Sequence, residues 1–273
     1  MSPPEHRPPS APPPADAAPG DRSPFPTVRA GLTAGAPFGW LSDGLDDFKA
    51  CKTASLFYGA CFVVMGWVLV FAFKHAVQLI TAVTTGFFLV GPFFAIGLYE
   101  LSRRRERKLP PELGPTLAVW KANAAAIGIY SLVLIVLYLL WARASMVTFA
   151  LFYSGGIPTM ATFAAEVARF DNLEFLFAYF VVGGVFALLV FAFSVVSIPL
   201  MLDRGQDTVT AMIASFLALV RNPAAMVVWA LAIVVLAAVG IATAFIGLAI
   251  TGPLLGHATW HAYRELIGPA AEG

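Results

Sequence analysis

Long apolar stretches separated by short polar segments dominate the chain from residue 53 to residue 265. A run of about 20 apolar residues is long enough to cross the hydrocarbon core of a bilayer as a helix. The pattern predicts six such spans, and the last two are separated because residues 223–262 are too many for one crossing. We therefore expect an all-α membrane protein with spans at residues 54–73, 77–99, 119–141, 175–200, 223–239 and 241–262.

Two shorter segments have the apolar stripe of a helix that lies in the membrane surface. In residues 38–48 the stripe consists of Phe38, Leu41, Leu45 and Phe48. In residues 208–220 it consists of Val209, Met212, Ile213, Phe216, Leu217 and Val220. We expect Asp207 to cap the second helix, and Asn222-Pro223 to end it and start the next span.

The first 36 residues differ from the rest of the chain because proline recurs throughout them. Proline removes backbone donors, and the intervening small and charged residues cannot build a core. Residues 1–36 are therefore predicted to be a disordered, proline-rich cytoplasmic tail. Residues 37–267 are predicted to form one helical membrane domain.

Charge sets the expected orientation. Hydrophobic residues make up 59% of the chain and charged residues 12%, and the formal net charge is only +1, which disfavours a nucleic-acid binder. The densest positive run, Arg103–Lys108, falls between two predicted spans, and lysine and arginine mark the cytoplasmic side. We expect both termini and this run in the cytoplasm, and residues 143–174 outside.

The chain contains an internal similarity between residues 86–92 and 247–253, each beginning with Gly and ending with Gly-Pro. Continued without a gap, the comparison places Arg103 opposite Arg264. It predicts a same-orientation repeat with halves at about residues 38–104 and 208–265. The Gly-Pro steps should kink two closely packed helices, and the alternative is a solute site between broken helices. The predicted kink residues are Gly91, Pro92, Gly252 and Pro253.

Candidate chemistry is sparse. His257 and His261 are four residues apart, so they share one helix face and are the best candidates for a metal or haem site. The alternative is a pair of hydrogen-bonded histidines at the membrane interface. No span centre holds a charged residue, and neither a catalytic triad motif nor a phosphate-binding glycine loop is present. We therefore predict no catalytic residue, no bound metal and no cofactor.

Several segments together resemble the DUF2189 family of uncharacterised bacterial integral membrane proteins. The resemblance rests on residues 43–48, 91–100, 197–203, 221–223 and 252–264. It implies a bacterial inner membrane and no established activity. Some relatives carry a cytochrome c oxidase label, but a haem–copper core needs more histidines than the membrane part offers, so a respiratory complex enters only as a partner by association.

Three functional hypotheses follow from these observations. The first is a non-catalytic membrane protein that binds lipid and other membrane proteins as an accessory or assembly subunit. The alternative is a small-solute transporter or channel built on the repeat. The third is a haem- or metal-binding membrane protein that uses His257 and His261.

Overall fold

The computed structural model describes residues 26–75, 80–152, 169 and 172–268, with the side chains of 80–83 and 85–92 left out of the description. Helices account for the regular structure in this part of the chain, apart from one isolated β-bridge between Val28 and Ile267. The elements are α1 (Ala36–Ala50), α2 (Lys52–His75), α3 (Ile80–Glu106), α4 (Leu113–Thr116), η2 (Val119–Asn123), α5 (Ala124–Phe152), α7 (Leu173–Ser194), α8 (Ser197–Arg204), α9 (Thr208–Arg221), α10 (Pro223–Ala242) and α11 (Leu248–Leu266).

Within the described residues, four helical stretches are long and apolar enough to cross a membrane: Lys52–His75, Leu113–Phe152, Leu173–Arg204 and Pro223–Ala242. They correspond to the first, third, fourth and fifth predicted spans. The second half of α11 carries two histidines, Arg264 and Glu265, which make it more polar than these four. The all-helical membrane architecture is confirmed, and the count of six spans stays a prediction.

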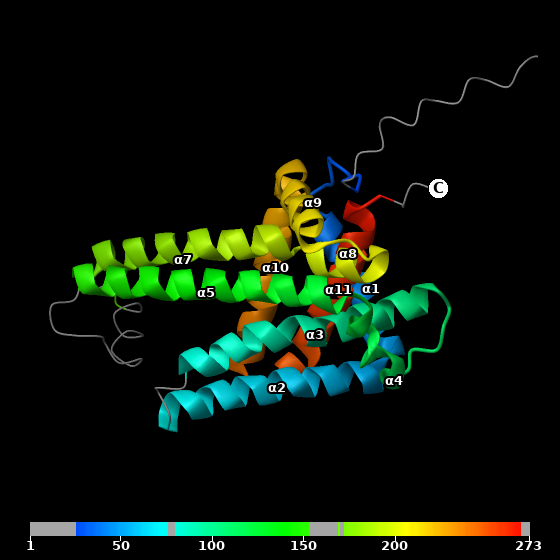
Figure 1. Cartoon of the computed structure of the whole chain (residues 1–273), viewed down its shortest axis with the longest axis horizontal. Helices are drawn as coiled ribbons and strands as arrows, with labels where there is room; N and C mark the ends of the chain where they lie inside the picture. Colours follow the sequence, from blue (N-terminus) through cyan, green and yellow to red (C-terminus); the bar gives the residue numbers. More distant parts are fainter. Residues whose placement is uncertain (1–25, 76–79, 153–168, 170–171, 269–273) are drawn as a thin grey trace, which may run out of the picture.

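The helices form two pairs that meet through α3 and α5, and α11 packs against the α2/α3 pair. α5 and α7 lie side by side along the long axis of the molecule, α2 and α3 form a second pair, and α10 crosses behind them (Figure 1). α11 packs against α1, α2, α3 and α10, so most of its surface is covered by this chain. The hydrophobic core centres on the ends of α3, α5, α8 and α11 rather than on the middle of the spans.

Both ends of the described chain meet at one end of the molecule. The backbone N–H of Arg29 donates to the carbonyl of Leu266 at 2.8 Å, and the Arg204 guanidinium donates to the carbonyl of Gly268. Residues 26–35, which the sequence pattern assigns to the tail, therefore lie against the C-terminal segment. The Arg103–Lys108 run lies at the same end, because Arg105 pairs with Asp47 of α1. Which side of a membrane this end faces stays a prediction.

Part of each apolar stripe of α1 and α9 faces away from the rest of the chain, whereas Leu41, Met212 and Leu217 pack against the core. Phe38 in α1 is 67% exposed and Val209 in α9 is 65% exposed. The opposite faces pack inward, with Trp40, Gly44 and Asp47 in α1 and a row of alanines in α9. The predicted cap is confirmed, because the Asp207 carboxylate accepts from the N–H groups of Val209 and Thr210.

The two predicted repeat halves share the order of one short and two long helices. They pack differently, however. α1 lies along α11, whereas α9, its counterpart, packs mainly against α7 and α8. The internal repeat therefore stays a prediction from sequence.

Candidate functional site

Polar side chains gather where α1, α3, α8 and α11 meet, at the end of the molecule that holds both described termini. They form two neighbouring groups. The histidine cluster consists of Asp47, Ser55, Ser102, His257 and His261. The arginine pocket is lined by Arg103, Glu106, Arg107, Asp203, Trp260 and Arg264.

His257 lies at the centre of the histidine cluster and is fully buried. Its Nε2 is 2.8 Å from the Ser55 hydroxyl of α2, and its Nδ1 is 2.8 Å from the Ser102 hydroxyl of α3. A hydroxyl can both donate and accept, so these two serines satisfy the ring in either neutral tautomer. The imidazole thus joins α2, α3 and α11 through hydrogen bonds that a buried polar group requires.

Asp47 connects α1 to the same cluster. Its carboxylate contacts His261 Nε2 at 2.8 Å and an Arg105 guanidinium nitrogen at 2.5 Å, and its side chain is only 6% exposed. Burial opposes the charged form of Asp47, but hydrogen bonding from His261 and Ser102 outweighs it and holds the pKa below its ordinary value of 3.8. An ionised Asp47 therefore fastens α1 to both α3 and α11.

These contacts bear on the metal hypothesis. Both ring nitrogens of His257 and the Nε2 of His261 are engaged by protein groups. His75 lies at the far end of α2, where its ring stacks on Phe71 and contacts the Phe71 carbonyl. Across the part of the chain that the structure describes, no group of three His, Cys, Asp or Glu side chains is arranged to hold a metal ion. Both histidines are therefore hydrogen-bonded within the protein, and the absence of a metal site stays a prediction.

Sequence reasoning identified His257 and His261 but missed their partners. Ser55 and Ser102 are single serines in apolar or basic surroundings, with no spacing that marks them. Asp47 carried a usable signal, because it shares a helix face with Gly44 and lies away from the apolar stripe of α1. A small residue and a carboxylate on one face of a surface helix indicate a face that packs on protein.

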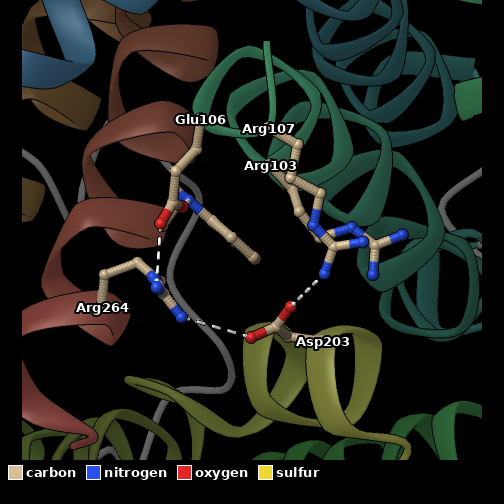
Figure 2. Close-up of a pocket in the computed structure, with 6 residues that line it drawn as sticks. Arg103, Glu106, Arg107, Asp203 and Arg264 are labelled. Carbon is tan, nitrogen blue, oxygen red and sulfur yellow. Dashed lines mark hydrogen bonds and ion pairs between the residues drawn. The ribbon is translucent and has the colours of Figure 1, made fainter. Parts of the chain in front are cut away.

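The arginine pocket is a cavity of about 270 Å³ between α3, α8 and α11. Figure 2 shows Arg103 and Arg107 of α3 on one side, Arg264 of α11 on the other, and Asp203 of α8 between them. Asp203 pairs with Arg107 at 3.2 Å and Arg264 at 3.5 Å, and Glu106 pairs with Arg264 at 2.8 Å. Arg103 also pairs with Glu100 of its own helix at 2.6 Å, so each of the three guanidinium groups has a carboxylate partner.

The predicted kink residues separate into two cases. Pro253 lies inside α11 and is buried, and a side chain added at Gly252 would come within 2.8 Å of the Phe62 ring of α2. One turn on, Gly256 approaches Leu98 of α3 just as closely. Gly91 and Pro92 belong to α3, but their side chains lie outside the described part of the structure.

Comparison with known proteins supports the membrane assignment. Residues 79–203 match the model of the DUF2189 family, which is described as a predicted integral membrane protein. The match runs from α3 to the end of α8 and confirms the resemblance over that segment. No curated protein and no solved structure matches the chain. The chain is therefore an integral membrane protein, and its activity has to be inferred from its own surfaces.

Proposed function

We propose that this chain is a non-catalytic accessory or assembly subunit that packs its spans against another protein in a bacterial inner membrane. The observation that carries the proposal is Gly184, near the middle of α7. A side chain added at Gly184 would meet nothing within 4 Å, although the flanking Val181 and Leu188 are large, apolar and exposed. Gly184 therefore opens a notch in an otherwise bulky outward face.

A glycine at position 184 lowers the stability of α7 and makes no close contact within the chain that would compensate for this loss. Glycine in a helix interior is less stable than alanine by about 0.5–1 kcal/mol because its backbone loses more freedom. Gly252 and Gly256 of α11 are explained by close contacts, whereas Gly184, like Gly39 and Gly128, meets nothing within 4 Å. Small residues on membrane helices allow another helix to approach closely. A helix of a partner protein seated at Gly184 supplies the missing contact.

Two further spans have room for partners. Only 22% of the most apolar stretch of α2 and of α10 is buried by this chain. The solute-transport alternative finds less support, since Phe62 and Leu98 pack tightly against the glycines beside Pro253. The oxidase label on some DUF2189 relatives makes a respiratory complex the first partner to examine.

A photo-crosslinking experiment tests the proposal. A photoreactive residue at Val181, beside the notch, should form a crosslink to a discrete protein in native membranes. Gly184→Leu fills the notch and should lower the yield of that crosslink about tenfold, because overpacking a helix contact costs about 1–3 kcal/mol. Folding of the isolated chain should be unchanged, since nothing within it contacts the new side chain.

Ala238→Leu is the matched control, because Ala238 is exposed on α10 and the change adds similar bulk to another span. It should leave the crosslink at Val181 intact. Crosslinks to lipid alone, or a protein crosslink that survives Gly184→Leu, would contradict the proposal. Mass spectrometry of the crosslinked product identifies the partner.

A further inference from the structure

The arginine pocket has hydrogen-bond donors that its own carboxylates do not use. Each guanidinium carries five N–H donors. Asp203 already accepts from the Tyr263 hydroxyl at 2.8 Å as well as from Arg107, and Glu106 accepts from the Trp260 indole at 3.1 Å. The buried Nε of Arg103 has no partner among the described residues. The contacts of Arg107 with Asp203, and of Arg264 with Glu106 and Asp203, use only part of the five donors on each of these two guanidinium groups.

The Arg103–Lys108 run is divided between two tasks. Arg105 pairs with Asp47, and Arg104 donates to the Pro110 carbonyl at 2.8 Å, so both serve the packing of neighbouring segments. Arg103 and Arg107 are four residues apart and lie on the pocket side of α3 (Figure 2). A charge that only sets membrane orientation does not need to converge on a cavity. Arg103 pairs with Glu100 and donates to the Leu202 carbonyl at 3.1 Å, so Arg107 is the arginine of this run that is better placed to bind a ligand in the cavity.

Arg264 completes the pocket from a different helix. The ungapped comparison of the two sequence halves places it opposite Arg103, and the structure brings the two residues to one cavity. Its guanidinium is held in place by Glu106 and Asp203, and Asp203 also binds Arg107. The side chains of Arg107 and Arg264 are 55% and 41% exposed, so a ligand can reach them from outside.

The chemistry of these groups matches a phosphate. Guanidinium groups bind both phosphate and carboxylate oxygens through pairs of parallel hydrogen bonds. A phosphate group has a third acceptor oxygen and a larger negative charge, so it can bind two guanidinium groups at once. The cavity of about 270 Å³ suits a small headgroup rather than a large ligand. The exposed apolar side chains of α1 and α9, such as Phe38 and Val209, lie at the same end of the molecule. If they contact the bilayer, the pocket lies near the level of the lipid phosphates.

We propose that the arginine pocket binds a phosphate group, carried either by an anionic phospholipid or by a soluble phosphate compound. The site is separate from the notch at Gly184, so it holds or fails independently of the proposed partner.

The test uses the full chain in a mild uncharged detergent, with binding followed by native mass spectrometry and by the shift in unfolding temperature. The probes are dioctanoyl phosphatidylglycerol, dioctanoylglycerol with the same chains but no phosphate, inorganic phosphate and acetate. We expect saturable binding of phosphatidylglycerol, inorganic phosphate or both, and none of dioctanoylglycerol or acetate. Binding of the lipid alone identifies a membrane source, and displacement of the lipid by inorganic phosphate identifies a soluble one.

Two adjacent residues provide a matched pair. Arg107 lines the pocket, whereas Lys108 is an exposed cation outside it. Arg107→Gln should weaken phosphate binding about tenfold, the effect of losing a hydrogen bond to a charged group. Lys108→Gln should change it less than twofold. Asp203 keeps Tyr263 and Arg264 as partners in the first variant, so the fold should survive.

Arg107→Lys is a second variant in case Arg107→Gln fails to fold. Lysine keeps a positive charge beside Asp203 but lacks the paired N–H donors of the planar guanidinium group. Arg107→Lys should weaken binding by less than Arg107→Gln. Equal weakening by Arg107→Gln and Lys108→Gln would overturn the proposal, because it would show a diffuse charge effect. Binding of acetate as tight as that of phosphate, or no binding of either phosphate probe, would also overturn it.

Discussion

At the scale of single residues, Asp47 has the largest share of interactions at the polar end of the molecule. One carboxylate contacts Arg105 of α3 and His261 of α11 from its place in α1. Removing one partner of a buried ion pair leaves the others desolvated and uncompensated. Asp46, its neighbour, is 59% exposed and pairs only with Lys49 in the same helix. The two adjacent carboxylates therefore provide an internal comparison.

Asp47→Asn should lower the free energy of unfolding by about 2 kcal/mol at pH 7, because the charge that holds Arg105 and His261 is lost. Asp46→Asn should change it by less than about 0.5 kcal/mol, as expected for an exposed ion pair. Thermal unfolding in detergent, followed by tryptophan fluorescence, measures both. Equal effects would contradict the anchoring role of Asp47.

The contacts of Asp47 also predict that the stability of the folded chain depends on pH. The pKa of Asp47 in the folded chain is lower than its ordinary value of 3.8, so the unfolded chain takes up the proton first as the pH falls. The stability advantage of the native chain over Asp47→Asn should be complete at pH 5. It should shrink as the pH falls below 3.8 through the lowered pKa. An advantage that grows between pH 5 and pH 3 would contradict this assignment.

At the scale of elements, the contact of α1 with α11 depends on close backbone approach. A side chain added at Gly44 would lie 2.7 Å from the backbone nitrogen of Ala258, whereas one added at Gly39 would meet nothing within 4 Å. One helical turn before Gly44, Trp40 of α1 packs edge-on against Trp229 of α10 at a centroid distance of 5.6 Å. The close approach at Gly44 and the contact between the Trp40 and Trp229 indoles thus hold α1 against α11 and α10.

Gly44→Ala should destabilise the protein by about 1–3 kcal/mol, because a main-chain atom of α11 cannot yield to the new methyl group. Gly39→Ala should stabilise it by about 0.5–1 kcal/mol, through helix propensity alone. Both variants replace a glycine of α1 by alanine, so effects on stability of opposite sign would isolate the contact of Gly44 with Ala258. Apparent unfolding temperatures in one detergent provide the comparison.

The helices themselves could be predicted from sequence because apolar periodicity and caps act locally. Asp207 as a cap and Asn222-Pro223 as a boundary correspond to the ends of α9 and α10. The interpretation of α1 and α9 as amphipathic surface helices stays a prediction, and the sequence did not indicate what their inward faces pack against. That information is not local, since Gly44 meets Ala258 more than 200 positions away in the sequence.

The candidate site was predictable only in part for the same reason. The spacing of His257 and His261 indicated a shared helix face, but Ser55 and Ser102 come from two other helices. The arginine pocket was not predicted, because the Arg103–Lys108 run was already explained as a signal of membrane orientation. Only the position of Asp203 and Arg264 around the same cavity distinguishes Arg103 and Arg107 from the rest of the run.

At the scale of the whole molecule, polar groups are concentrated at one end. The Arg103–Lys108 run, both described termini, the histidine cluster and the arginine pocket all lie there. The far ends of α2 and α7 lie at the opposite side of the molecule (Figure 1). Because positive residues are retained in the cytoplasm, this asymmetry favours an orientation with the polar end inside.

Cysteine labelling tests this orientation, and with it the central claim of a membrane protein with a cytoplasmic polar end. Single cysteines at Lys74, Leu173 and Lys108, all exposed, are introduced after Cys51 and Cys61 are replaced by alanine. An impermeant maleimide is applied to intact spheroplasts. Lys74→Cys and Leu173→Cys should react, and Lys108→Cys should react only after permeabilisation. Reaction of Lys108→Cys alone in intact spheroplasts would reverse the orientation, and reaction at all three sites would contradict the account.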